Sequence, residues 1–304
     1  MKYCQYSNHG RMIDKFKKGS NDNVLFVTSA CSNRCIMCCQ PPKHGDDSEH
    51  LYQKNLAVIA SADSDTDYVC ITGGEPTLIG DKLFIYMHKI WERMPDAEIH
   101  FLTNGRKFAE VEYLTAFVKN VKGNMVLGIP LHSDNPIDHA SIFYKHMEGK
   151  GSFYETLKGL HNLGLLGFNI ELRVILLQQN CQRLPKIAEF ISLNLPFVSQ
   201  VSIMGLEITG YAEKRFQEVW IDPIFCTTEL TRAVACLEQS RIQVRLFNIP
   251  LCLLPPQLWN YSCRSISNWK QTYLAVCERC KVKEQCCGMF STSKRYSGFI
   301  RPIL

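Results

Sequence analysis

Three cysteines in one short stretch have types and spacing that suit an iron–sulfur cluster. Cys31, Cys35 and Cys38 form the pattern Cys-x3-Cys-x2-Cys, directly after an apolar, strand-like run at residues 24–28. A loop that leaves such a strand can fold back and direct all three sulfurs to one point. Iron–sulfur clusters are normally held by four cysteines. Three thiolates therefore leave one iron of a four-iron cluster open to chelate a small molecule, much as a catalytic zinc ion keeps one position free.

A second stretch has the composition of a ligand-binding turn. Gly73-Gly74-Glu75-Pro76 follows the apolar run at residues 68–72. Paired glycines let the backbone approach a ligand closely, and a carboxylate with neighbouring carbonyls can accept hydrogen bonds from an ammonium group. On its own this segment would be an ordinary strand-ending turn. However, the cysteine loop and this segment each follow directly after a strand-like run. Together with their separation in the sequence, this shared position favours a ligand site.

The elements that position these residues can be read from the apolar runs. Strands are expected at residues 24–28, 68–72, 98–103, 125–131, 168–176 and 200–204, and helices at 48–62, 82–93, 151–162 and 184–193. Such alternation predicts βα units and a parallel sheet, with two units fewer than a closed eight-fold barrel. Ligand sites in these folds lie at the carboxyl ends of the strands. The residues at or near those ends are Cys31, Gly73, Asn104, His132 and Arg173.

Together, the cysteine loop and the Gly-Gly-Glu-Pro segment resemble those of the radical S-adenosylmethionine (SAM) superfamily. The resemblance implies an α/β fold with a partial (β/α)6 barrel at residues 23–240, after an N-terminal lead-in at residues 1–22. It implies that Cys31, Cys35 and Cys38 hold a [4Fe-4S] cluster whose open iron chelates SAM. Reductive cleavage of SAM would then give a 5′-deoxyadenosyl radical that abstracts hydrogen from a substrate. Gly73, Gly74, Glu75 and Pro76 would hold the amino group of SAM.

Other residues are candidates for cofactor contacts. Met37 occupies the position where family members usually place an aromatic residue against the adenine, and it is apolar and polarizable. Arg173 suits the SAM carboxylate, or it is a surface arginine on an edge strand. Asn104 and His132 contact ribose or substrate, or they are local turn and core residues. A bulky residue at Gly74 is expected to crowd SAM without touching the cluster.

A second metal site is not expected around His132, His139 and His146, because their loop reads as polar surface. Isolated motifs of this kind often mislead.

A group of cysteines near the C-terminus suggests another cluster. The spacing Cys277-x2-Cys280-x5-Cys286 resembles the auxiliary-cluster part of SPASM domains, but the next cysteine of that pattern would fall at Phe290. The resemblance therefore implies a shorter, twitch-like domain at residues 241–304 with one auxiliary iron–sulfur cluster. Four thiolates complete such a site, and we assign Cys252, Cys277, Cys280 and Cys286. Cys263 is the alternative first ligand and Cys287 the alternative last ligand, and a four-cysteine zinc ribbon is the alternative kind of site.

Several stretches together resemble the His-Xaa-Ser system radical SAM maturases of the HxsC type. They are residues 35–42, 73–78, 171–173 and 265–270 and the cysteine-rich C-terminal region. This resemblance implies a ribosomally made peptide substrate with His-Xaa-Ser repeats. It also implies an external electron donor such as flavodoxin or ferredoxin, and it allows a second maturase as partner.

Composition limits the other classes. The chain has 304 residues, 46% of them hydrophobic and 21% charged, and a formal charge of +5. This charge is too small to argue for nucleic acid. The 15 cysteines have spacings that fit cluster ligands better than disulfides. No signal-peptide core or membrane-spanning run is present, so a cytoplasmic protein with no membrane partner is expected.

Two other functions stay open. One is a radical SAM enzyme that acts on RNA or a small metabolite, although no basic, aromatic-lined stripe of the kind that binds RNA is visible. The other is a zinc-binding interaction module without catalysis.

Overall fold

The computed structural model describes residues 15–304, except 43–44, 46, 144–150, 265 and 267. His146 and most of the expected lead-in therefore lie outside the described residues. The chain divides into two compact units. The first unit comprises residues 1–34, 40–130 and 151–170, and the second comprises residues 35–39, 131–150 and 171–304.

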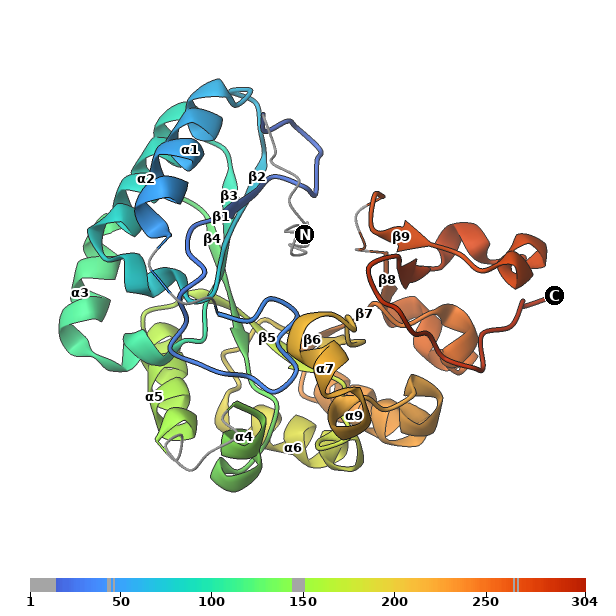
Figure 1. Ribbon diagram of the computed structural model, residues 1–304. Coiled ribbons are helices and arrows are strands. Elements are labelled where there is room, and N and C mark those ends of the chain that lie inside the picture. Colours follow the sequence, from blue (N-terminus) through green and yellow to red (C-terminus); the bar gives the residue numbers. More distant parts are fainter. Residues whose placement is uncertain (1–14, 43–44, 46, 144–150, 265, 267) are drawn as a thin grey trace. The chain divides into compact units, whose positions relative to one another are not determined.

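The first unit is built on four parallel strands that pair in chain order. They are β1 (Val24–Phe26), β2 (Tyr68–Thr72), β3 (Glu98–Leu102) and β4 (Met125–Pro130). Figure 1 shows the helices α1 (Ser48–Ser61), α2 (Asp81–Arg93) and α3 (Val111–Asn120) along one side of these strands, and α5 (Ser152–Leu165) completes the unit. All five residues of β2 are buried, as expected for a parallel strand with both faces packed.

An aromatic cluster forms much of the core of the first unit. Tyr113 and Phe117 lie four residues apart, on one face of α3. Phe117 is fully buried, and its ring lies 4.8 Å from that of Phe108 and 6.0 Å from that of Phe101 on β3. Burying one such side chain contributes about 1.5–3 kcal/mol. This packing holds the end of β3, from which Asn104 leads toward the candidate site.

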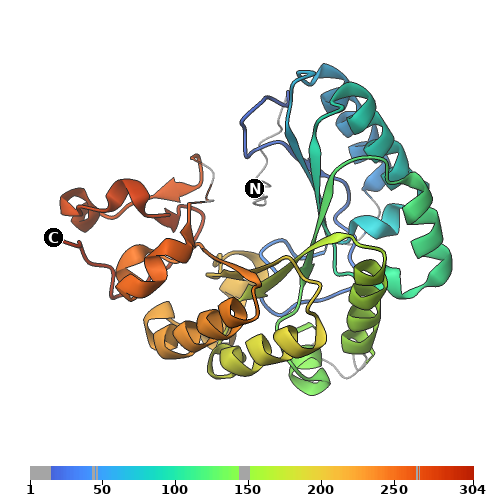
Figure 2. The ribbon, with the colours of Figure 1, turned by 180° about the vertical axis from the view of Figure 1, so that it is seen from behind.

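The second unit contains further parallel strands and the C-terminal region. Four parallel strands pair in chain order: β5 (Asn169–Ile175), most of which lies in this unit, β6 (Gln200–Met204), β7 (Gln243–Phe247) and the short β8 (Ser262–Cys263). The helices α6 (Leu184–Asn194) and α9 (Thr227–Gln239) pack side by side (Figure 2). The other helices are α4 (Pro136–Phe143), α7 (Gly210–Lys214) and α8 (Phe216–Val219), and β9 (Gln271–Thr272) and β10 (Met289–Phe290) form an antiparallel pair.

The expected α/β class is confirmed, and all six expected strands are present with ends within about two residues of those predicted. In the part of the chain that the structure describes, five helices are additions to the expected set: α3, α4, α7, α8 and α9. The run at residues 244–250, which also predicts a strand, forms β7, and β7 pairs in parallel with β6. Where the C-terminal domain begins stays a prediction. Among the described residues, no helix combines the length and apolar character needed to cross a membrane.

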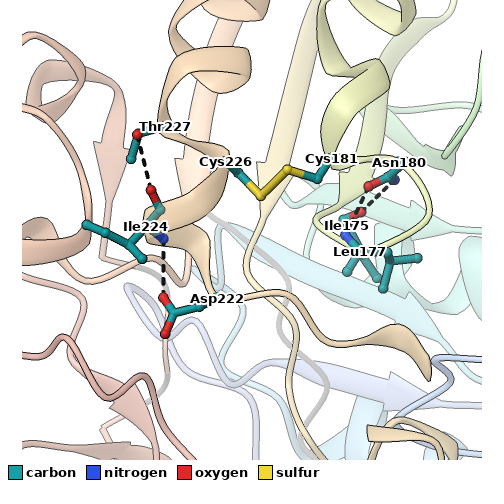
Figure 3. The surroundings of a disulfide bond; sticks show 8 residues. All are labelled: Ile175, Leu177, Asn180, Cys181, Asp222, Ile224, Cys226 and Thr227. Atoms are coloured by element: carbon teal, nitrogen blue, oxygen red, sulfur yellow. Dashed lines mark hydrogen bonds between the residues drawn. A yellow bond between two sulfur atoms is a disulfide. The ribbon is translucent and has the colours of Figure 1, made fainter. Parts of the chain in front are cut away.

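One pair of cysteines forms a disulfide that the sequence did not predict. Cys181 and Cys226 form a disulfide across 45 positions of sequence, between the turn after β5 and the start of α9 (Figure 3). The Asn180 side chain stabilises the turn after β5. It donates to the Ile175 carbonyl at 2.9 Å and accepts from the Leu177 N–H at 2.9 Å. The two cysteines meet only through packing, so no local spacing predicts their bond.

Candidate active site

The cluster loop, residues 31–38, belongs to both units. Cys31 lies in the first unit, where its sulfur accepts a hydrogen bond from the Asn33 N–H at 3.3 Å. Cys35 and Cys38 lie in the second unit, joined by a turn in which the Cys38 N–H donates to the Cys35 carbonyl at 3.1 Å. All three cysteines are partly exposed. Hydrogen bonds to sulfur are among the contacts that tune iron–sulfur clusters, so this donor set fits the expected group.

The Gly-Gly-Glu-Pro segment packs directly on the backbone that leads into Cys31. The Gly74 N–H donates to the Thr28 carbonyl at 2.7 Å, and the Glu75 N–H donates to the Ala30 carbonyl at 2.8 Å. A Cβ atom on Gly73 would stand 2.6 Å from the Thr28 carbonyl oxygen, and one on Gly74 would collide with the Ala30 carbonyl. Glycine is therefore required here for close backbone approach.

The carboxylate of Glu75 points into the protein and joins the ends of β2 and β3. It is 1% exposed, and Oε2 accepts from the Asn104 N–H at 2.6 Å. Oε1 accepts from the Thr103 hydroxyl at 2.7 Å and the Thr77 hydroxyl at 2.8 Å. Burial raises the pKa of Glu75, and these hydrogen bonds oppose that rise. The Glu75 carboxylate is thus hydrogen-bonded within the protein. The expected contact with the SAM ammonium group would therefore involve backbone carbonyls of this segment, and it stays a prediction.

Pro76 stands at the first position of a short 3-10 helix, η1 (Pro76–Ile79). Its fixed φ angle suits this position. The proline thereby sets the direction in which the chain leaves Glu75.

Asn104 and Arg106, which follow β3, hold the first half of the cluster loop. The Asn104 side chain donates to the Ser32 hydroxyl at 2.9 Å. The Arg106 guanidinium donates to the Asn33 side-chain oxygen at 2.9 Å and forms an ion pair with Glu155 at 2.6 Å. The expected ribose or substrate contact of Asn104 stays a prediction. Arg106 was missed by the sequence reasoning, although its place just after a strand end was an available signal.

The contacts of Gly74 correct the expectation that a bulky residue there would leave the cluster untouched. We predict that Gly74→Val loses SAM binding and the iron of the cluster at Cys31, Cys35 and Cys38, because the new side chain displaces the Ala30 peptide next to Cys31. Iron, acid-labile sulfide and SAM affinity of anaerobically purified protein test this. Gly298→Val is the matched control, since nothing lies within 4 Å of its Cβ position. Full iron content in Gly74→Val would contradict the prediction.

Met37 and His132 are both packed in the core of the second unit. Met37 is 4% exposed and belongs to an apolar cluster with Ile142, Phe143 and Leu177. The His132 ring stacks on Phe143 at 5.3 Å, and its Nδ1 accepts from the Ile175 N–H at 3.2 Å. Burial lowers the pKa of His132 to about 3, so the ring is neutral. Cofactor contacts of both residues stay predictions.

The loop with His132 and His139 was expected to be polar surface, and this expectation is wrong for these two side chains. His132 is 2% exposed and His139 is 1% exposed. Proline and the acidic residues suggested a surface loop, whereas α4 turns its aromatic face inward, where His139 stacks on Phe143 at 4.3 Å.

Arg173 lies on β5 and is partly exposed. Its guanidinium donates to the sulfur of Met204 on β6 at 3.4 Å. An ion pair with the SAM carboxylate stays a prediction.

Four cysteines of the C-terminal region line a single pocket. They are the four assigned from the sequence, Cys252, Cys277, Cys280 and Cys286, whereas Cys263 and Cys287 are not part of the lining. The Cys286 sulfur accepts from the N–H groups of Leu251 at 3.5 Å and Gly288 at 3.4 Å. The Cys280 sulfur accepts from the Ile303 N–H at 3.4 Å.

The electrostatics of this pocket favour at least one thiolate. The neighbouring Cys287 thiol and the N–H groups of Gly288 and Leu251 lower the pKa of Cys286 to about 6, against the effect of burial. Burial and neighbouring thiols raise the pKa values of Cys252 and Cys277. Within the described ranges, no three His, Cys, Asp or Glu side chains converge tightly enough to hold one metal ion.

Comparison with known proteins identifies the family. The sequence model of the radical SAM superfamily matches residues 25–191, more than half of the chain. This protein therefore belongs to the radical SAM superfamily.

Two curated relatives illustrate the range of similar proteins. A GTP 3′,8-cyclase of Actinobacillus pleuropneumoniae is 33% identical over 109 residues, which cover 34% of this chain and 32% of the relative. The mycofactocin maturase MftC of Mycolicibacterium smegmatis is 25% identical over 222 residues, which cover 70% of this chain and 51% of the relative. The chain thus matches about a third of the length of the first protein and about half of the second.

Solved structures share the fold. Native anSMEcpe with bound AdoMet and Kp18Cys peptide has a TM-score of 0.54 at 13% identity, with 73% of this chain and 62% of that chain covered. Streptococcus suis SuiB bound to S-adenosylmethionine has a TM-score of 0.50 at 11% identity, with 79% and 48% covered. At these identities the likeness concerns the fold alone.

Proposed function

We propose that this radical SAM enzyme matures a ribosomally made peptide. The observation that carries the proposal is the alignment with MftC, named a maturase, over 70% of this chain. When bound, the [4Fe-4S] cluster and SAM would supply a 5′-deoxyadenosyl radical that abstracts hydrogen. Cys31, Cys35 and Cys38 are the residues of this chain that would hold the cluster, and the Gly73–Pro76 backbone would orient SAM.

We also propose an auxiliary iron–sulfur cluster on Cys252, Cys277, Cys280 and Cys286. Their shared pocket and the N–H groups directed at Cys280 and Cys286 support this set. Cys263 and Cys287 are weaker choices because they lie outside the lining. The auxiliary cluster would belong to a twitch-like domain at residues 241–304, after a radical SAM core at residues 23–240.

The partners follow from the resemblance to His-Xaa-Ser system maturases. We propose a precursor peptide with His-Xaa-Ser repeats and an electron donor such as flavodoxin or ferredoxin, and the resemblance allows a second maturase. A cytoplasmic location of the reaction is part of this proposal.

A deuterium-transfer assay tests the peptide substrate. We predict that a His-Xaa-Ser precursor peptide, incubated anaerobically with the enzyme, SAM and a reductant, changes mass. Deuterium from the labelled peptide should appear in 5′-deoxyadenosine, because the radical takes hydrogen from the substrate. Mass spectrometry measures both products, and a reaction without SAM is the control.

The second candidate substrate is a small nucleotide, since several relatives are named GTP 3′,8-cyclase. The same assay with GTP separates the two functions. Consumption of GTP with an unchanged peptide would contradict peptide maturation while leaving the radical SAM assignment in place.

A further inference from the structure

The segment that follows β6, residues 207–211, binds the end of the cluster loop. The Tyr211 N–H donates to the Cys38 carbonyl at 2.8 Å, and the Thr209 hydroxyl donates to the Cys39 carbonyl at 3.2 Å. These carbonyls belong to the two successive peptide groups that follow the third expected cluster ligand, Cys38. Their hydrogen bonds therefore restrict the direction in which the Cys38 side chain leaves the backbone.

The same segment is bound from its other side by the C-terminal region, within the second unit. Glu207 accepts from the Lys270 ammonium group at 3.1 Å and from the Thr292 hydroxyl at 2.7 Å. The Ile208 N–H donates to the Ser293 hydroxyl at 2.9 Å. Residues 207–211 thus form a continuous polar connection between the cluster loop and the C-terminal region.

The ion pair in this connection is buried. The Lys270 side chain is 2% exposed and that of Glu207 is 10% exposed. A buried ion pair is weak evidence for stability, because the cost of desolvation offsets the attraction and a packed apolar pair often serves as well. The pair does impose a direction on both side chains. By contrast, the nearby Lys294–Glu213 pair has its lysine side chain 73% exposed and its glutamate 39% exposed.

We propose that Lys270 is a positioning residue for the cluster loop. Through Glu207 it holds residues 207–211, and these hold the Cys38 and Cys39 carbonyls in place. The C-terminal region would in this way set the geometry of the cluster that binds SAM. This inference rests on the proposed cluster at Cys31, Cys35 and Cys38, and it assigns Lys270 no contact with the cofactor.

The test uses the full chain, reconstituted anaerobically with iron and sulfide. Lys270→Met should shift the midpoint potential of the SAM-binding cluster and alter its EPR spectrum with SAM. SAM cleavage should fall by about 10- to 100-fold, as for other residues that orient a metal ligand. Lys270→Arg keeps the charge and should restore all three properties. Lys294→Met breaks the exposed pair and should change none of them.

A double variant separates positioning from folding, because Lys270→Met alone leaves Glu207 buried without its partner. Glu207→Leu/Lys270→Met replaces the pair by apolar side chains, which cores often tolerate. We expect this variant to fold with an altered EPR spectrum and midpoint potential. If it folds with the wild-type spectrum, potential and SAM cleavage, the positioning role is wrong. A wild-type protein with no SAM-responsive cluster would instead contradict the proposed function.

Discussion

Simultaneous replacement of Cys31, Cys35 and Cys38 by alanine is expected to abolish the production of 5′-deoxyadenosine from SAM. Without these thiolates, the loop offers no ligand to the iron that SAM would chelate. The C-terminal pocket keeps all four of its cysteines, so the variant should remain brown and carry about four irons per chain, by the four-cysteine rule. Product analysis by liquid chromatography and iron determination measure the two effects.

The triple variant tests two assignments at once. Continued SAM cleavage would show that the cluster loop is not the catalytic centre. Stoichiometric zinc without iron would show that the C-terminal cysteines form a zinc site, which would leave one redox centre. The Lys294→Met protein, altered only in an exposed ion pair, is a suitable control for purification and reconstitution.

Cys280→Ala is expected to abolish product formation while SAM cleavage continues. Cys280 lines the C-terminal pocket, and its sulfur accepts the Ile303 N–H. Its loss leaves the auxiliary cluster one thiolate short of a complete ligand set, so this cluster should be destabilised and the iron content should fall. The radical is generated at the other cluster, and the auxiliary cluster would serve electron transfer and brace a small domain. Parallel measurement of 5′-deoxyadenosine and modified peptide tests this, and equal loss of both would contradict it.

The choice of first ligand has its own test. Cys252 lines the pocket, whereas Cys263 lies outside the lining, with its thiol 3.7 Å from the Tyr261 carbonyl. We therefore expect Cys252→Ala to lose the auxiliary cluster and Cys263→Ala to keep it. The reverse result would exchange the two residues and leave the domain assignment unchanged.

The sequence alone was sufficient for the elements whose signals are local. β2 could be placed because a fully apolar run ends at paired glycines, and α6 because its apolar residues recur with helical spacing after Pro185. The candidate ligands Cys31, Cys35 and Cys38 were identifiable for the same reason, since ligand type and spacing lie within one short loop. Such features depend on neighbours in the chain, and they require no knowledge of what packs against them.

Only the tertiary structure decided where the polar side chains point. Glu75 binds the end of β3 instead of facing outward, because the Thr103 hydroxyl and the Asn104 N–H lie beside it in the fold. The Cys181–Cys226 disulfide and the Lys270–Glu207 ion pair likewise join residues 45 and 63 positions apart. Many groups along the chain could form a hydrogen bond, an ion pair or a disulfide with such a side chain. The packing of the fold decides which of them lies close enough to do so. The sequence therefore determined which residues could do the chemistry, and the fold determined which of them support one another.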